Sequence, residues 1–160
     1  MDAELNLLEW QRDQYAHDMR NHFDILSLHK QERIRHYAGH FAKYVGRVAR
    51  GKDEKKPVSQ TLIDGILVCL SAANTLHQHL SYTPKRSNVD FFYRFADAAG
   101  RFNDASEKID HLEPFVDAAR TSNQDIFDCL VDEAFEVKIE LPAALDSRRA
   151  ELRARQFFIR

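Results

Sequence analysis

The sequence has few of the residues that end helices or form tight turns: its 160 residues include only five glycines and four prolines. Sandwiches and barrels need such residues between successive short strands, so their scarcity argues against an all-β fold. The long stretches between them repeat apolar residues at about the helical period. A chain of 160 residues also fits one domain. We therefore predict a single all-α domain over residues 1–160, a bundle of about five to seven helices with short loops.

Strong net charge and long apolar runs are missing as well. The formal charge of −2 gives no electrostatic reason to expect nucleic acid or an anionic membrane as the partner. No apolar run approaches the roughly 20 residues that span a bilayer. Residues 1–8 lack the basic start and apolar core of a signal sequence. We expect a cytoplasmic protein that binds neither nucleic acid nor membrane.

Cysteine is rare, and the motifs of several common active sites are absent. Cys69 and Cys129 each lie in an apolar helical pattern, which favours buried, reduced thiols. The chain has no Gly-rich phosphate loop, no C-x-x-C pair and no G-x-S-x-G turn. Together with the absence of predicted strands, this excludes a Rossmann-type enzyme. Any chemistry must come from residues spaced along helices.

Apolar periodicity and turn residues divide the chain into seven predicted helices. Gly51 is placed to end the second helix, Asn88 to cap the fourth, and Ser122 or Asn123 to cap the sixth. In the first helix, Leu5, Leu8, Tyr15 and Met19 form one apolar stripe beside Trp10. The predicted ranges are 2–21, 28–50, 57–80, a helix from 88 that ends before Pro114, 114–120, 124–141 and 143–160.

A polar stripe follows the predicted helix 28–50. At about 100° per residue its members fall within roughly a third of a turn; they are His29, Glu32, His36, His40, Lys43 and Arg47. Two interpretations stay open. The stripe is a solvated helix face, or His36 and His40, spaced i and i+4 with Glu32 one turn earlier, hold a metal ion. Lys43 and Arg47 on the same stripe oppose a bound cation.

Asp64 is the most suggestive single residue. It is the only formally charged side chain between Pro57 and Pro84, in a helix apolar enough to be central. A buried carboxylate must be paired, coordinated or protonated, because an isolated buried charge is costly. Asp64 therefore either forms a structural pair with Arg47, Lys43 or a histidine of the preceding helix, or binds a ligand.

An acidic stripe lies on the predicted helix 124–141, at residues Asp128, Asp132, Glu133, Glu136 and Glu140. Carboxylates at this spacing suit Mg²⁺, and they are also typical of an exposed helix face. The basic helix 143–160 is expected to neutralise the stripe, within one chain or across a dimer. Near the end of that helix, Phe157 and Phe158 either form a docking segment or pack onto the bundle.

The first 80 residues resemble, in layout, the MazG-like all-α nucleotide pyrophosphohydrolases. The segments that carry the resemblance are an L-x-x-x-Q start at Leu7–Gln11, KYVGR at 43–47, TLID at 61–64, and an A-N-x-L ending that includes Asn74 and Leu76. On this view residues 1–80 form a MazG-like helical core, and residues 88–160 add further helices and a basic C-terminal helix.

The resemblance implies a ligand and a cofactor. In that family two acidic motifs bind Mg²⁺, which positions a nucleoside triphosphate for attack by water between the α- and β-phosphates. Here Lys43, Tyr44 and Arg47 replace the carboxylates of the first motif, and Asp64 alone is kept from the second. Asp64 is thus the implied catalytic residue and Mg²⁺ the implied cofactor. The implied ligand-binding residues are His40, Lys43, Tyr44, Arg47 and Asn74.

The metal and the assembly extend this hypothesis. If the helix 124–141 packs against the helix 57–80, Glu133 and Glu136 could converge with Asp64 on Mg²⁺. The family also implies a homo-oligomer. The leading hypothesis is a MazG-like protein that binds a nucleotide or other phosphorylated small molecule, with hydrolysis open. The alternatives are a non-catalytic interaction or regulatory module, and a metal-binding protein that uses Glu32, His36 and His40.

Overall fold

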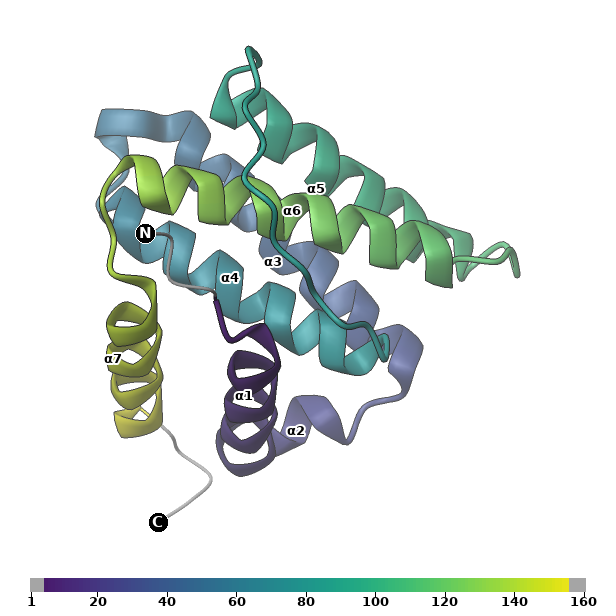
Figure 1. The fold of residues 1–160 in the computed structure, drawn as a ribbon. Helices are drawn as coiled ribbons and strands as arrows, with labels where there is room; N and C mark the ends of the chain where they lie inside the picture. The colour runs from purple at the N-terminus through teal and green to yellow at the C-terminus, as the bar shows by residue number, and fades with distance from the viewer. Residues whose placement is uncertain (1–4, 156–160) are drawn as a thin grey trace.

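The computed structural model describes residues 5–155, and within that range the regular structure is entirely helical (Figure 1). The predicted all-α bundle is confirmed. Its elements are α1 (Leu7–Asn21), α2 (Phe23–Leu26), α3 (Lys30–Arg50), the short 3₁₀ helix η1 (Gly51–Asp53), α4 (Val58–Thr75), α5 (Phe91–Lys108), α6 (Val116–Glu136) and α7 (Leu141–Ala154).

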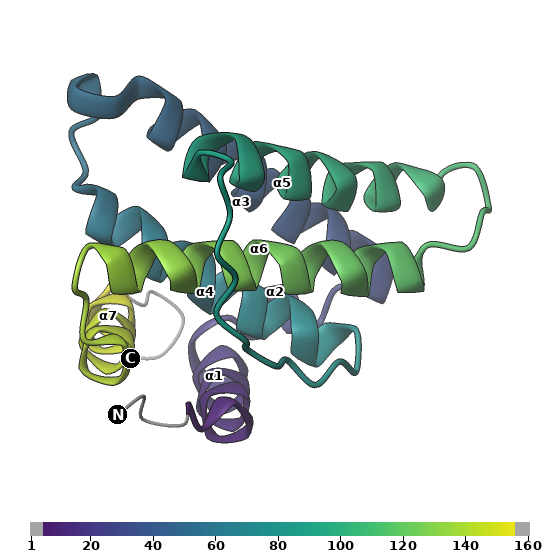
Figure 2. The same cartoon turned by 45° about the horizontal axis from the view of Figure 1, so that its top comes forward.

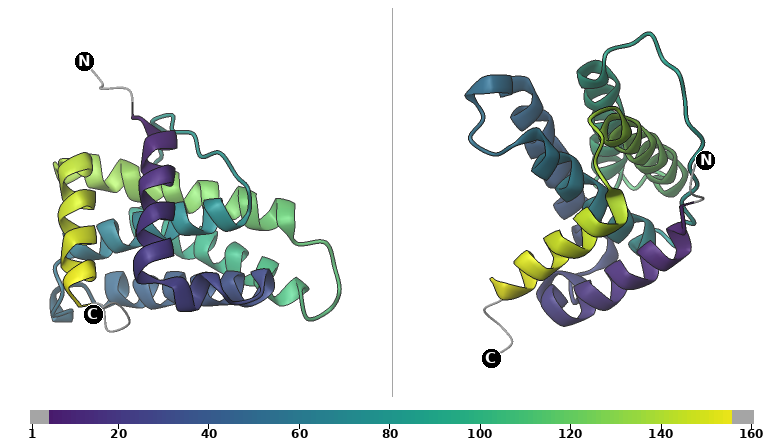
Figure 3. Two further views of the ribbon diagram at one scale, coloured as in Figure 1. Left: turned by 90° about the horizontal axis from the view of Figure 1, so that it is seen from below. Right: turned by 60° about the vertical axis from the view of Figure 1, so that its left-hand side comes forward.

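Helix α4 is the centre of the bundle. Most of its residues are buried, and it packs against α1, α3, α6 and α7. Helices α5 and α6 form a pair on one side of α4, with α5 also against α3 (Figures 1 and 2). On the other side α1 and α7 cross α4 at a steep angle (Figure 3). The first and last helices of the described chain therefore lie on the same side of the central helix.

Several local signals act as expected. Gly51 ends α3 with a φ of 53°, in the left-handed region that glycine adopts without strain. Cys69 and Cys129 are both buried, unpaired thiols, as predicted. The predicted cap Asn88 is replaced by Asp90, whose carboxylate accepts a hydrogen bond from the backbone N–H of Phe92 at 2.9 Å. The same kind of cap forms two residues later along the chain.

The predicted break at residues 122–123 is wrong, because α6 is continuous. Ser122 donates to the carbonyl of Ala118 at 2.7 Å, a bond within its own helix. Asn123 donates across the bundle to the carbonyl of Cys69 at 3.1 Å. Side chains that cap helices in other contexts are here buried and used for packing. Helix α4, in turn, ends at Thr75 rather than at residue 80, and His77 follows with a φ of 51°.

Helix α1 faces the bundle with its polar side and the solvent with its predicted apolar stripe, the reverse of the expected orientation. Leu8, Tyr15 and Met19 of the predicted apolar stripe face outward, with 47%, 52% and 42% of their surfaces exposed. Apart from Leu7 and Trp10, the buried side of α1 is polar. Its polar members are Gln11, Gln14, His17, Asp18 and Asn21. Apolar burial alone therefore does not hold this helix in place, and its buried polar groups need partners.

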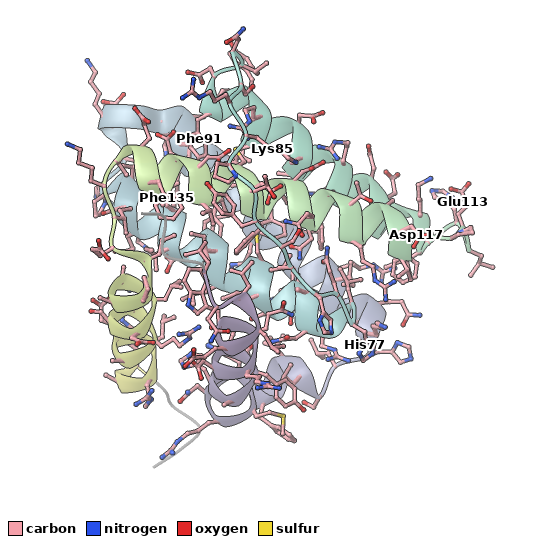
Figure 4. The ribbon with its side chains drawn as sticks, in the orientation of Figure 1. His77, Lys85, Phe91, Glu113, Asp117 and Phe135 are labelled. Carbon is pink, nitrogen blue, oxygen red and sulfur yellow. The ribbon has the colours of Figure 1, made fainter. Side chains whose placement is uncertain are left out.

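The acidic stripe on α6 is neutralised by the loop before α5 and by α5 itself. Lys85 lies 3.0 Å from Asp128, and Arg94 lies 2.9 Å from Asp132 (Figure 4 labels Lys85). Within one chain the basic C-terminal helix does not do this, because Arg148 and Arg149 of α7 are buried against α1 and α4 instead. Neutralisation across a dimer stays a prediction. Phe157 and Phe158 lie outside the described residues.

No helix among residues 5–155 is both long enough and apolar enough to cross a membrane.

The close approach of α4 and α6 at Gly65 yields a first prediction. A Cβ atom on Gly65 would lie 2.7 Å from Cδ1 of Leu130. We expect Gly65→Val to lower the free energy of unfolding by about 1–3 kcal/mol through overpacking, measured by urea denaturation. Gly100→Val is the control, because the position of its Cβ is open, and we expect a change within about 0.5 kcal/mol. Equal losses at both positions would contradict the packing argument.

Candidate functional site

A pocket of about 390 Å³ lies between α1, α2, α3, α4 and α7. Its size is within the range of small-molecule sites, roughly 300–1,000 Å³. One end carries Lys43, Arg47, Lys56, Asp64 and Arg148. The remainder is lined by polar residues of α1 and by apolar side chains, which include Ile25, Leu26, Leu67, Val68 and Leu152. The pocket thus combines a charged end with a mixed polar and apolar chamber.

Asp64 is the buried carboxylate of the charged end, and it is held by two arginines. Its surface is 8% exposed. Arg148 of α7 binds both of its oxygens, with Nε 2.7 Å from Oδ1 and Nη2 3.3 Å from Oδ2. Arg47 of α3 adds a longer ion pair, Nη1 to Oδ2 at 3.5 Å. The pairing predicted with Arg47 is present, whereas the closer partner Arg148 was not foreseen.

Arg47 lines the pocket, but its Nη1 is buried and faces Oδ2 of Asp64 at 3.5 Å. The residue is about nine-tenths buried, yet its Nη1 makes no hydrogen bond to any described residue. Its guanidinium carbon lies 5.1 Å from the centre of the Tyr44 ring, a cation–π contact. A buried donor without a partner is rare in proteins and calls for a physical explanation. Here the nearest carboxylate oxygen, Oδ2 of Asp64, is already bound by Arg148 and lies slightly too far from Arg47 for a hydrogen bond.

Lys43, His40 and His36 form a chain of hydrogen bonds along α3. Lys43 Nζ lies 3.0 Å from His40 Nδ1, and His40 Nε2 lies 3.1 Å from His36 Nε2. Because a lysine ammonium only donates, His40 Nδ1 accepts and His40 Nε2 carries the proton given to His36. Burial lowers the pKa of His40 to about 4 and also lowers the pKa values of His36 and Lys43. The imidazoles are therefore neutral at pH 7 and act as dipoles that hold Lys43 in place.

The metal site predicted from Glu32, His36 and His40 is not formed. Glu32 accepts a bond from the backbone N–H of His29 at 3.2 Å, so it caps α3 and does not join the two histidines. Both nitrogens of His40 are occupied by hydrogen bonds. Over residues 5–155, no three His, Cys, Asp or Glu side chains form a group that could hold a metal ion.

The same finding applies to Asp64, Glu133 and Glu136. Helix α6 does pack against α4, as the hypothesis required, but it presents Leu130 to α4 at Gly65. Burial, and then like-charge repulsion from Glu136 and Asp90, raises the pKa of Glu133, while Arg94 of α5 opposes the shift. The two carboxylates of α6 therefore do not join Asp64.

Asn74, predicted as a ligand-binding residue, does not line this pocket. It donates to the backbone carbonyl of Gln11 at 2.9 Å and accepts from the Gln11 side chain at 3.2 Å. These bonds tie α4 to α1 outside the candidate pocket. Of the residues assigned to the ligand, His40, Lys43, Tyr44 and Arg47 do line the pocket together with Asp64.

Asp18 of α1 is a pocket residue that sequence reasoning missed. It accepts hydrogen bonds from Ser71 Oγ at 2.6 Å and from Gln14 Nε2 at 2.9 Å. Burial raises its pKa to about 6, although these bonds oppose the shift. Arg149 of α7 donates to Gln14 Oε1 at 3.0 Å, so the network also links α1 to α7. The sequence does carry one indication of this role. Asp18 lies on the side of the helix opposite its apolar stripe.

Comparisons with known proteins leave the family undecided: no protein-family model matches the chain, and no curated protein or solved structure matches it significantly.

Removing the charge of Asp64 tests its structural role. Asp64→Asn leaves Arg148 and Arg47 buried without a counter-charge, and breaking a buried pair costs about 3–5 kcal/mol. We expect a loss of that size in urea denaturation. The control is Asp97→Asn, whose pair with Arg101 is solvent-exposed and should be worth at most about 1 kcal/mol. A loss at Asp64 as small as that at Asp97 would show that the buried pair contributes little.

The buried histidines predict how stability depends on pH. The unfolded chain protonates His40 near its ordinary pKa of 6.5, and the folded protein only near 4, so stability falls as pH drops through that window. His17, with a pKa also lowered to about 4, acts in the same direction. Asp18 acts oppositely, because its raised pKa favours the folded state as pH falls below about 6. The pKa of His36 is lowered as well, whereas those of Asp128 and Glu133 are raised. Among these groups the shifts of His17 and His40 are the largest, so we expect a net loss of stability.

We expect urea denaturation to give a lower free energy of unfolding at about pH 5 than at about pH 7, and His40→Gln to reduce that difference. His111→Gln, at an exposed position outside the pocket, should leave the difference unchanged. An unchanged difference in His40→Gln would mean that His40 titrates alike in both states.

Proposed function

We propose that this chain is a MazG-like helical protein that binds a nucleotide or other phosphorylated small molecule in the pocket between α1, α3, α4 and α7. The observation that carries the proposal is the group of four cations in this pocket of about 390 Å³, Lys43, Arg47, Lys56 and Arg148, which accompany the single carboxylate of Asp64 at its charged end. Phosphate oxygens are the acceptors that guanidinium groups bind best.

The neighbouring charges support an anion. Lys43, Lys56 and Arg148 line the same end as Arg47, and Asp64 is the single carboxylate there. Lys43 has three N–H donors, of which one points to His40, so two are left for a ligand. Because the histidines beside it are neutral, they hold the ammonium without adding to the repulsion among the cations. The charged end is therefore suited to an anion with more than one negative charge.

The rest of the pocket supports an organic group attached to that anion. Ile25, Leu26 and Val68 provide apolar surface, and Tyr37 and Asp18 provide polar contacts at the wall. Inorganic phosphate would occupy only the cationic end. A nucleoside monophosphate or a similar ester would fill both parts, which is why a phosphorylated small molecule is preferred to a bare ion.

The donor set at Asp64 does not fit Mg²⁺. The resemblance implies this ion, but magnesium sites use carboxylates and phosphate oxygens in octahedral geometry. Here one carboxylate is bound by Arg148 and faced by Arg47, and both cations would have to move before a metal could enter. We therefore propose binding without a metal, and the experiment below includes an arm with Mg²⁺ to test whether hydrolysis adds to it.

The test is a calorimetric titration with inorganic phosphate and with nucleoside mono-, di- and triphosphates, each in EDTA and in Mg²⁺. We expect binding in EDTA that is tighter for the nucleotides than for phosphate. Lys43→Gln should weaken it about 10- to 100-fold, the value of one charge-assisted hydrogen bond. Lys43 is exposed, so this substitution should not unfold the protein.

Lys52→Gln is the matched control, because Lys52 is an exposed lysine of η1 outside the pocket. If both substitutions weaken binding equally, the effect comes from the net charge of the protein, and the proposed site is wrong. If none of these compounds binds, the proposal is wrong. Binding only in Mg²⁺, with release of pyrophosphate, would overturn the metal-free mechanism in favour of the hydrolase.

A further inference from the structure

The candidate pocket has two buried carboxylates in its wall, and they differ in their partners. Asp64 is paired with Arg148 and Arg47. Asp18 of α1 is only 5% exposed and lines the same pocket, but it forms no ion pair with any described residue. A buried carboxylate without a cation is costly. Asp18 therefore offers a ligand a negative charge that the described part of the protein does not neutralise.

Hydrogen bonds hold the carboxylate of Asp18 in a fixed orientation and leave it free to accept more. Ser71 Oγ donates to its Oδ2 at 2.6 Å, and Gln14 Nε2 donates to its Oδ1 at 2.9 Å. Gln14 is fixed in turn by Arg149, which donates to its Oε1 at 3.0 Å. Each oxygen of a carboxylate accepts about two hydrogen bonds, so each oxygen of Asp18 can accept one more. The group is thus a preorganised acceptor in the pocket wall.

Helix α4 sets the distance between the two ends of the pocket. Asp64 stands at the cationic end and Ser71 at the end of Asp18, seven residues further along the helix. Seven residues are about two turns, so both positions share one face of α4 and lie about 10 Å apart. Leu67 lies between them and also lines the pocket. Along α4 the pocket therefore presents cations, then apolar surface, then a carboxylate.

We propose that Asp18 is the specificity-determining residue of this pocket, and that it selects phosphorylated ligands with an amino group at the end opposite the phosphate. The inference rests on the proposed function, because the phosphate must occupy the cationic end. Among nucleotides, those of cytosine and adenine qualify, since their exocyclic amino groups donate hydrogen bonds. An extended nucleoside monophosphate has about the required length from its phosphorus atom to that amino group.

The order of charges in the pocket fixes the direction of such a ligand. In the reverse orientation the phosphate would face the carboxylate of Asp18, and the amino group would meet the donors of Arg47 and Lys43. Uracil and hypoxanthine carry a carbonyl oxygen in place of the amino group, and a carboxylate repels it. A site built to accept a hydrogen bond from a ligand discriminates strongly against the analogue that lacks the donor.

The test is a calorimetric titration of the full chain in EDTA at about pH 7.5, where Asp18 is ionised because its pKa is about 6. The ligands form two matched pairs, cytidine with uridine monophosphate and adenosine with inosine monophosphate. Within each pair the phosphate and the sugar are the same. We expect the amino member to bind about 10- to 100-fold more tightly, the value of one hydrogen bond to a charged group.

This comparison needs no variant, and its outcomes separate the two proposals. Equal affinities within the pairs, or tighter binding of the carbonyl members, would overturn the role of Asp18 and leave the proposed function in place. If none of the four nucleotides binds, both proposals are wrong.

Asp18→Asn tests the residue itself. Gln14 can only donate, because its oxygen is bound by Arg149, so the amide oxygen of Asn should take the place of Oδ1. The amide nitrogen then replaces Oδ2, donates to Ser71 Oγ and presents its second N–H to the ligand. We expect the preference for the amino members to fall to about 3-fold or less, or to reverse.

Asp24→Asn is the matched control. Asp24 also lines the pocket, but its side chain is exposed, so the preference for the amino members should be kept. Circular dichroism shows whether each variant is folded. If Asp18 has a merely structural role, Asp18→Asn weakens both members of each pair equally and leaves the preference unchanged, which overturns the inference. If Asp18→Asn does not fold, the comparison within the wild-type pairs decides.

Discussion

The buried carboxylate of Asp64 is the constraint on which the arrangement of the helices around the pocket depends. Taking one charge out of water costs several kcal/mol unless a partner compensates it. Its two partners come from α3 and α7, so one ionised group on the central helix fixes the positions of two others. The compensation is uneven, because Arg148 is satisfied and Arg47 is not. Lys43 and Lys56 line the same end of the pocket, so the cations there outnumber the carboxylate.

Helix α1 shows how a site can override the usual rule for burying a helix. Local consistency would place its apolar stripe on α4, and sequences usually violate such consistency at functional positions. Here the inner side of α1 is polar because it supplies Gln14 and Asp18 to the pocket wall. Hydrogen bonds to Ser71 of α4 and from Arg149 of α7 replace much of the apolar contact. The apolar residues Leu8, Tyr15 and Met19 are left on the surface.

The sequence predicts the fold better than the site. Helical periodicity and scarce turn residues are local properties, so the class and most helix positions follow from them. Lys43, Tyr44, Arg47 and His40 share one helix, and their convergence near Asp64 was predictable because adjacent helices pack side by side. Arg148 was not, since it meets Asp64 across 84 residues and no periodic pattern encodes such a pair. Asn123 was predicted as a helix cap and Glu133 as a metal ligand for the same reason. Their roles depend on partners in other helices, which the sequence pattern does not reveal.

The two sides of the pocket are far apart in the order of synthesis. Gln14 and Arg149, which are hydrogen-bonded in the wall between α1 and α7, are separated by 135 residues. Domains can fold from the N-terminus as the chain emerges from the ribosome. Until α7 has been added, Asp64 lacks its closest cation and Gln14 lacks its partner Arg149. The addition of α7 therefore completes the pocket wall and the pairing of Asp64 at the same time.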